Sequence, residues 1–181
     1  MQSLATSRRA MGSGFLSGMP AAGKSSSPRG SAAQLEPDSL SELRARALRH
    51  LARREHSRDE LARKLSPYAE SPEVLEGLLR ELESKKQLSD ERFAEVRTHW
   101  LARKYGAAKI RQDLTSKGIP QELAERAAVG LNETEKAKAI LERKYRAPAA
   151  TREERAKRAR FLQGRGFSGD VIRRLVLQSE D

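Results

Sequence analysis

The chain repeats itself about every 48 residues, and this repeat restricts the possible folds more than any other feature of the sequence. Residues 117–119 (KGI) match residues 165–167 (RGF) at an offset of 48, and at the same offset Leu114 falls on Leu162. An offset of 49 relates a first copy to the second, with Leu65 falling on Leu114. A period of this length, made of one long and two short helices, is typical of a tandem helical array whose units contact mainly their neighbours.

From about residue 37, apolar residues recur at helical spacing, and Ser, Pro and Gly separate the segments. The sequence therefore predicts an all-α fold of three tandem three-helix repeats, helix-turn-helix-like units that form an elongated, curved array with a disordered N-terminal tail. We expect a disordered Ser/Gly/Ala-rich leader over residues 1–36, repeat 1 over 37–88, repeat 2 over 89–131 and repeat 3 over 132–181. Repeat 1 departs from the pattern, because Ala69 and Glu70 stand where the other copies have a glycine and an apolar residue.

Apolar residues at intervals of three and four predict one buried face for each helix. The first helix of repeat 1 is expected to bury Leu40, Leu43, Ala47 and Leu51, and the first helix of repeat 2 is expected to bury Phe93, Val96, Trp100 and Leu101. The run Ser57–Glu60 predicts a capping box at the start of the second helix.

The composition excludes several classes of protein. No stretch approaches the ~18–20 uncharged apolar residues of a membrane helix. The absence of cysteine excludes disulfides and thiolate chemistry, and it fits a reducing compartment. The formal net charge of +11 comes from 36 Lys and Arg against 25 Asp and Glu, with the excess at the two ends of the chain. Such a surface favours polyanions or acidic protein patches.

The leader contains one motif that has to be weighed. Residues 18–25 (GMPAAGKS) satisfy the phosphate-loop pattern G-x-x-x-x-G-K-[ST]. A working phosphate loop needs a buried strand before it and a helix after it. The preceding residues are short and glycine-rich, and Pro28 and Gly30 would stop a helix at once. We therefore interpret the match as coincidental. Residues 1–34 contain Arg and Ser but no acidic residue, and they also resemble an organellar transit peptide, with a plain flexible tail as the alternative.

No group of residues predicts an active site. The only histidines are His50, His56 and His99, and their spacing does not match that of a helical zinc site, so we expect boundary or surface positions. Paired carboxylates such as Asp59-Glu60 fall in first helical turns, where the helix dipole favours negative charge. Phe93, Trp100 and Tyr105 could offer stacking surfaces for bases, but their helical spacing favours core packing.

Eight short sequence segments occur one after another between residues 40 and 178. They are residues 47–61 (ALRHLARREHSRDEL), 64–65 (KL), 88–94 (LSDERFA), 104–106 (KYG), 110–114 (IRQDL), 117–119 (KGI), 161–162 (FL) and 165–167 (RGF). Together, in this order and spacing, they resemble the RecX family, bacterial regulators of the RecA recombinase. Two positions depart from that family's pattern: Ala107 stands where proline is commoner after Tyr-Gly, and Ala69 stands in place of a glycine.

The resemblance implies tandem three-helix repeats without catalysis, cofactor or metal. It also implies binding in the helical groove of the RecA–single-stranded-DNA filament, across neighbouring protomers. Recombinase and coprotease activity in DNA repair and the SOS response would then usually be inhibited. On this basis we expect a cytoplasmic, monomeric protein with no membrane association, whose partner is the RecA filament.

Basic residues are the candidates for contact with RecA or DNA: Arg53, Arg54, Arg92, Arg103, Lys104, Arg111, Arg155, Arg158 and Arg165. Several admit a plainer interpretation, as cations at helix C-termini or on a solvated face. Arg92 could organise a contact between repeats instead. The alternative function is an autonomous basic helical protein that binds single- or double-stranded DNA, for which the basic excess of repeat 3 is the motivation.

Overall fold

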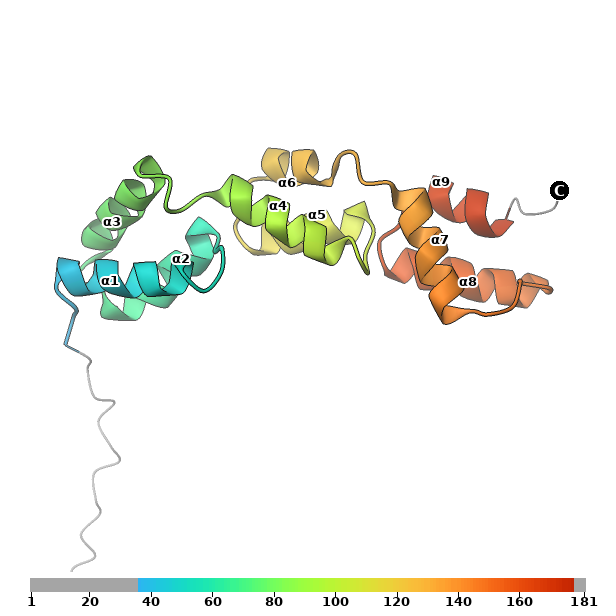
Figure 1. Ribbon diagram of the computed structural model, residues 1–181, viewed down its shortest axis with the longest axis horizontal. Helices are drawn as coiled ribbons and strands as arrows, with labels where there is room; N and C mark the ends of the chain where they lie inside the picture. The colour runs from blue at the N-terminus through green and yellow to red at the C-terminus, as the bar shows by residue number, and fades with distance from the viewer. Residues whose placement is uncertain (1–35, 178–181) are drawn as a thin grey trace, which may run out of the picture. The chain divides into compact units, whose positions relative to one another are not determined.

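The computed structural model describes residues 36–177, and every regular element in that range is helical (Figure 1). The helices are α1 (Leu40–Leu51), α2 (Arg58–Leu65), α3 (Pro72–Ser84), α4 (Asp90–Leu101), α5 (Ala107–Ser116), α6 (Gln121–Ala128), α7 (Glu133–Lys144), α8 (Arg152–Gly164) and α9 (Gly169–Ile172). A 3-10 turn, η1 (Ser66–Tyr68), follows α2, and a π-helical turn, η2 (Arg173–Leu177), follows α9. The predicted all-α fold of three-helix units is confirmed. The leader and its phosphate-loop match lie outside the described residues, and the repeat boundaries stay a prediction.

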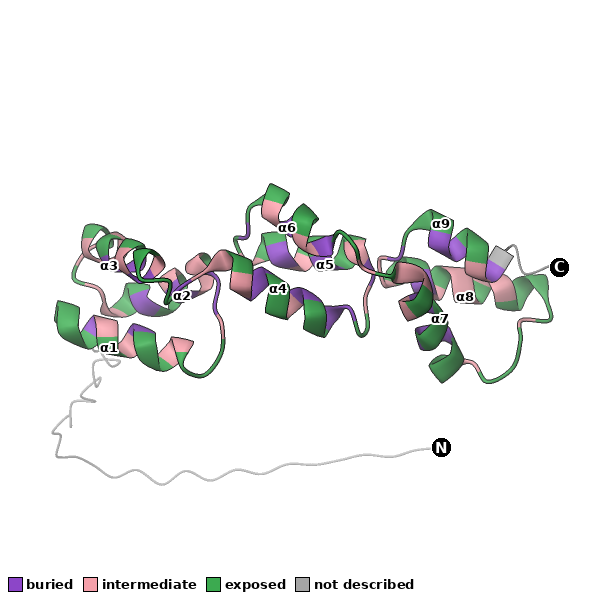
Figure 2. Cartoon of the chain, turned by 45° about the horizontal axis from the view of Figure 1, so that its top comes forward, coloured by how far each residue is buried: buried purple, intermediate pink, exposed green. Residues whose placement is uncertain are grey.

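Each group of three helices encloses its own hydrophobic core, and Figure 2 shows the buried residues on the faces that the helices turn toward one another. The first core contains Leu43, Leu61, Leu65, Leu78, Leu79, Leu82 and Leu88. The second contains Phe93, Leu101, Ile110, Leu114 and Ile119, and the third contains Ile140, Leu141, Leu162, Phe167, Val171 and Ile172. A chain with three small cores depends on the contacts between repeats to set their arrangement.

Short polar side chains fix where most helices begin. Ser39, Ser57, Ser71, Ser89 and Thr151 each accept a hydrogen bond from a backbone N–H in the first helical turn. These bonds satisfy donors that have no partner within the helix. The capping box predicted at Ser57 is half formed, because the Glu60 carboxylate binds Arg54 and Lys117 instead.

The junctions between consecutive repeats are built alike. Between α1–α3 and α4–α6, the hydroxyl of Ser57 donates to the backbone carbonyl of Lys117, in the turn between α5 and α6, at 2.6 Å. Between α4–α6 and α7–α9, the backbone N–H of Gly106 donates to the carbonyl of Arg165, in the turn between α8 and α9, at 2.9 Å. Lys117 and Arg165 are equivalent positions of the repeat. Polar backbone contacts, rather than a shared apolar core, therefore join the repeats.

A carboxylate from the following repeat completes each junction. Asp90, the first residue of α4, accepts the backbone N–H of Arg58 at 2.8 Å. Glu133, the first residue of α7, accepts the backbone N–H of Ala107 at 2.6 Å. Both N–H groups belong to the first residue of a helix, where a donor needs an external partner and a negative charge is favoured.

In the first repeat, the segment directly before α1 contacts the equivalent turn. The backbone N–H of Asp38 donates to the carbonyl of Tyr68 at 2.8 Å. Tyr68 precedes Lys117 by the repeat offset of 49. The Asp38 carboxylate also binds the guanidinium of Arg46 at 2.7 Å, and that guanidinium lies 3.6 Å from the centre of the Tyr68 ring.

Glycines allow the junctions to close. Gly166 has a φ of +78°, and a Cβ added there would lie 2.5 Å from the backbone nitrogen of Lys109. A Cβ on Gly106 would overlap the carbonyl of Gly166. At the other junction, Gly118 has a φ of +82°, and its Cβ would overlap the Asp59 carboxylate. Only glycine fits these close approaches.

Four burial expectations are wrong. Leu40, Val96 and Trp100 are 51%, 58% and 52% exposed, although Leu43, Ala47, Phe93 and Leu101 are buried as predicted. On α4 the small residues Ala94 and Thr98 take the inward positions, because the face between Phe93 and Leu101 packs on α5 and α6. His56, expected near the surface, is 3% exposed.

Candidate partner-binding surfaces

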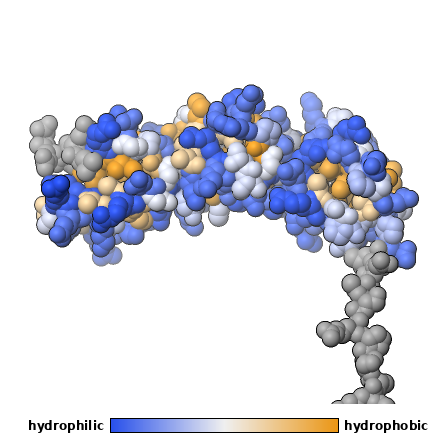
Figure 3. Space-filling model, turned by 180° about the vertical axis from the view of Figure 1, so that it is seen from behind, coloured by the Kyte–Doolittle hydropathy of each residue, from blue (hydrophilic) through white to orange (hydrophobic). Residues whose placement is uncertain are grey.

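The outward face of α4 combines polar and apolar side chains. Its inward face is filled by Phe93, Ala94, Thr98 and Leu101. The opposite face exposes Glu95, Val96, His99 and Trp100. On the side of the molecule drawn in Figure 3, hydrophobic side chains form separate patches among hydrophilic ones. Exposed apolar groups beside charges are common at protein interfaces and at nucleic-acid interfaces.

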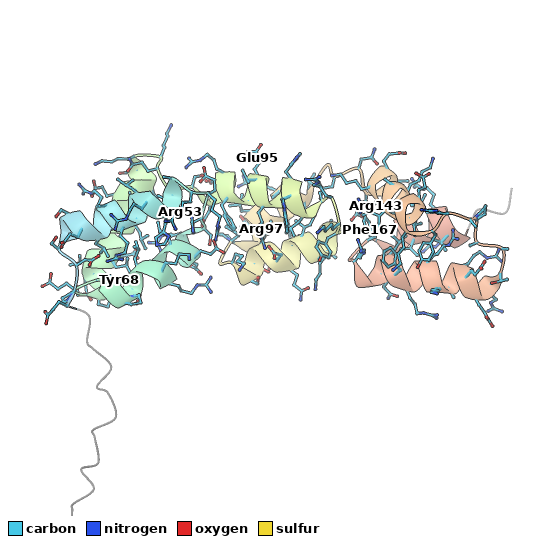
Figure 4. All side chains as sticks on the ribbon, turned by 60° about the horizontal axis from the view of Figure 1, so that its bottom comes forward. Arg53, Tyr68, Glu95, Arg97, Arg143 and Phe167 are labelled. Atoms are coloured by element: carbon cyan, nitrogen blue, oxygen red, sulfur yellow. The ribbon has the colours of Figure 1, made fainter. Side chains whose placement is uncertain are left out.

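A basic groove lies between the C-terminal end of α4 and the middle of α7. Its volume is about 260 Å³. Arg103 and His99 come from the α4 side, and Lys136 and Arg143 come from α7. Ala102, Ala139 and Ile140 supply the rest of the lining. Figure 4 labels Arg143 on α7.

The cations of this groove are available to a partner. Within residues 36–177, neither a hydrogen bond nor an ion pair involves the side chain of Arg103, Lys136 or Arg143. Arg103 and Arg143 are exposed, and Lys136 is half-buried. Unpaired cations that converge from two helices create a local positive potential that attracts carboxylates or phosphates. The apolar lining allows contact with an apolar group at the same place.

Four of the predicted contact residues also make contacts within the protein. Arg54 binds the Glu60 carboxylate at 2.9 Å, and Arg92 binds Glu55 at 3.0 Å. Because Glu55 precedes α2 and Arg92 lies on α4, the second pair spans two repeats. Arg158 donates to the carbonyl of Ala147 and lies 4.7 Å from the centre of the Tyr145 ring. Arg165 donates to the carbonyl of Lys104 at 3.0 Å and lies 4.5 Å from the Phe161 ring centre.

The other predicted residues are distributed over all three repeats. Arg53 follows α1, Arg103 and Lys104 follow α4, and Arg111 lies on α5, and all four are exposed. Figure 4 shows Arg53 beside the junction of the first two repeats. Arg155 is half-buried on α8. The structure therefore brings only Arg103 into the groove between α4 and α7.

Sequence reasoning missed His99, Lys136 and Arg143 as partners of Arg103. A weak signal existed on α7, because Lys136 and Arg143 are seven residues apart and Ile140 lies between them, which puts all three on one helical face. Nothing in the sequence places that face beside Arg103. Their proximity depends on the junction made by Gly106 and Arg165.

The pKa values of two half-buried carboxylates at the first junction are shifted in opposite directions. Burial raises the pKa of Glu60, but Arg54 and Lys117 outweigh burial and hold the pKa below its ordinary value. Burial also raises the pKa of Asp90, and the hydrogen bond from the Arg58 N–H only partly offsets it. Both groups serve the contact between repeats.

Neither a metal cluster nor a membrane span is found in the described part of the chain. Between residues 36 and 177, no three His, Asp or Glu side chains gather in a way that could hold a metal ion. None of the described helices is long and apolar enough to cross a membrane.

Two family models match this chain. The model for the second three-helix domain of RecX matches residues 89–127, and the model for the third matches residues 132–176. The first range contains α4, α5 and most of α6, and the second contains α7, α8 and α9.

Relatives and solved structures extend the similarity to most of the chain. The regulatory protein RecX of Herbaspirillum seropedicae is 49% identical over 133 residues, which cover 72% of this chain and 86% of that protein. The regulatory protein RecX of one Neisseria gonorrhoeae strain is 39% identical over 140 residues, covering 77% and 92%. The crystal structure of RecX from Lactobacillus salivarius superposes with a TM-score of 0.68 at 23% identity, covering 76% and 94%. That structure supports the fold.

Proposed function

This chain belongs to the RecX family of regulatory proteins, and from that premise we propose that it regulates the RecA recombinase. It binds in the helical groove of the RecA–single-stranded-DNA filament and mostly inhibits recombinase and coprotease activity. DNA repair and the SOS response are the processes in which it acts. It works by binding, without catalysis or a cofactor, as a monomer in the cytoplasm.

The observation that carries the proposal is the 49% identity to a regulatory protein RecX over 133 residues. The name of that relative says that it is regulatory, and the family resemblance supplies RecA as the target. The shared length includes 86% of the relative, so the comparison concerns nearly all of that protein.

The groove between α4 and α7 supports binding to another protein. Arg103, Lys136 and Arg143 present cations beside the apolar side chain of Ile140. A partner segment that carries carboxylates next to an apolar residue would match this lining. Charges at an interface mainly raise association rates and select the partner, while the apolar contact lowers dissociation.

The proposal is tested by measuring ATP hydrolysis by a bacterial RecA on single-stranded DNA. The protein is added at ratios well below one per RecA protomer, and filament length is followed in parallel. Falling ATP turnover and shortening filaments are the expected results. Unchanged turnover, unchanged filaments and no co-sedimentation with assembled filaments would overturn the proposal.

Charge reversal at the groove tests the site within the same assay. We expect that about tenfold more of the double variant Arg103→Glu/Arg143→Glu is needed for the same inhibition. The introduced glutamates would repel the carboxylates that the partner presents to this groove. Arg80→Glu on α3 is the control, since it reverses an exposed cation of repeat 1. If the double variant inhibits as well as the control, this groove is not the contact.

A further inference from the structure

A second groove lies between α4 and α5 and contains the chain's only tryptophan. Its volume is about 410 Å³, within the ~300–1,000 Å³ of small-ligand sites. Trp100 is 52% exposed, so about half of its surface is open to a ligand in this groove.

Two cations lie near the tryptophan ring. The guanidinium of Arg97 and the amine of Lys104 are each 5.6 Å from the centre of the ring. Arg97 is itself fixed by two hydrogen bonds to the Asp113 carboxylate on α5, at 2.8 and 2.9 Å. Figure 4 shows Arg97 between α4 and α5. At least one cation beside the ring is therefore positioned before any ligand arrives.

The rest of the groove is polar and basic. Lys109, Gln112 and Ser116 line it from α5, and all three are exposed. Asp113 is the only carboxylate in the lining, and its two oxygens already accept from Arg97. Lys104 and Lys109 therefore have no carboxylate of this groove to neutralise them.

We propose that this groove binds single-stranded nucleic acid, with a base stacked on Trp100 and backbone phosphates beside Lys104 and Lys109. An aromatic platform next to cations is the arrangement by which proteins bind single strands without reading sequence. Arg97 can extend the platform, because a guanidinium plane also stacks on bases. A protein partner would instead be expected to find exposed apolar residues around the tryptophan, whereas the exposed residues beside Trp100 in this groove are Lys104, Lys109, Gln112 and Ser116.

This site does not require RecA, so its failure and the failure of the proposed function can be told apart. Single-stranded DNA is the ligand that both would share. A strand held on Trp100 would bring the protein to the DNA of a filament, and that contact would act in addition to the contact through Arg103 and Arg143.

The test titrates oligo(dT) into the full-length protein without RecA while following tryptophan fluorescence. Because Trp100 is the only tryptophan, saturable quenching reports the environment of this one ring. The logarithm of the binding constant should fall with the logarithm of salt concentration, with a slope of about −0.7 for each phosphate contact. Lys104→Gln and Lys109→Gln should each flatten that slope by about this amount.

Substitution of the ring separates stacking from general charge attraction. By anisotropy of a labelled oligonucleotide, Trp100→Ala should bind roughly 5- to 150-fold more weakly, the range for the loss of one stacked base. Trp100→Phe, which retains a stacking ring, should lose less. Val96→Ala is the matched control, because Val96 is equally exposed on α4 but does not line this groove.

Three results would overturn the site. One is the absence of binding to oligo(dT) at low salt. Another is equal binding by Trp100→Ala and Val96→Ala. The third is a fluorescence change that RecA without DNA produces and oligo(dT) does not, which would assign the ring to a protein contact. Circular dichroism of each variant verifies that the helices are retained.

Discussion

The imidazole of His56 is buried within the first repeat. The residue is 3% exposed, its Nδ1 lies 3.0 Å from the carbonyl oxygen of Arg54, and its ring meets that of His50 edge-on at 5.7 Å. Burial lowers the pKa of His56, and the charges of Arg54 and Lys64 lower it further, while the hydrogen bond to the carbonyl opposes them. The pKa in the folded protein is therefore below that in the unfolded chain.

From this difference we predict that acidification weakens the fold near pH 6. Above about pH 7 the histidine is neutral in both states. As the pH falls below ~6.5, the unfolded state takes up the proton first, and the free energy of unfolding decreases by up to about 1.4 kcal/mol per pH unit for one histidine. Urea unfolding at pH 7.5, 6.5 and 5.5 measures this decrease.

The matched variants are His56→Gln, which removes the buried titrating group, and His99→Gln, which removes an exposed one. We expect a flatter pH dependence only for His56→Gln. Equal slopes for all three proteins would contradict the prediction. Should His56→Gln not fold, an NMR titration of the unaltered protein reports the pKa of His56 directly, and a value at or above 6.5 would be the contrary result.

Helical periodicity identified most buried residues but not the exposed tryptophan. Val96 and Trp100 are four residues apart, as are Ala94 and Thr98, so helical spacing alone does not distinguish the two pairs. The inward face of α4 takes the smaller residues because two helices pack on it. Side-chain volume at a contact depends on the neighbouring helices, which a local pattern does not contain.

At the scale of elements, the junctions between repeats depend on glycine more than on side-chain contacts. Gly106 and Gly166 bring two backbones close enough for the hydrogen bond from Gly106 to Arg165 and for the 3.2 Å bond from Ala108 to Gly166. A side chain on either glycine would separate these segments.

We predict that Gly166→Ala destabilises the protein more than Gly130→Ala. Both glycines have positive φ, +78° and +77°, but a Cβ on Gly130 would meet nothing within 4 Å. Gly130→Ala should therefore lose only the ~1–2 kcal/mol of left-handed backbone strain. Gly166→Ala should lose at least about 1 kcal/mol more through overlap with Lys109.

Urea unfolding of both variants measures the difference, and Gly106→Ala provides a third comparison, because its φ is −83° and only the overlap applies. Equal losses for Gly130→Ala and Gly166→Ala would mean that the junction relaxes freely. In that event Gly106→Ala should also be close to neutral.

The sequence predicted the helices well and the junctions only in part. Serine and glycine signals located the helix ends, because capping is local and each signal lies within a few residues of the bond it makes. The bond from Arg58 to Asp90 joins residues 32 apart, and no pattern in the sequence indicated it. The groove between α4 and α7 was missed for the same reason, since it depends on such a junction.

For the molecule as a whole, the three separate cores predict an extended arrangement of repeats. In every pair of helices that are in extensive contact, both helices belong to the same repeat. We expect small-angle X-ray scattering of protein lacking residues 1–34 to give a radius of gyration well above the ~15 Å of a compact domain of that length. The same measurement in high salt is the control for association, and a value near 15 Å would contradict the elongated array.

The bond between Asp38 and Tyr68 has a consequence for self-association. In the second and third repeats, the equivalent carbonyl receives the neighbouring module. In the first repeat, the backbone N–H of Asp38, directly before α1, already donates to this carbonyl, which belongs to Tyr68. The residue after Tyr68 is Ala69 with a φ of −80°, where the other two repeats have a glycine with positive φ. Because the Tyr68 carbonyl already accepts from the same chain, we expect that it does not take part in a head-to-tail contact with a second copy of the protein.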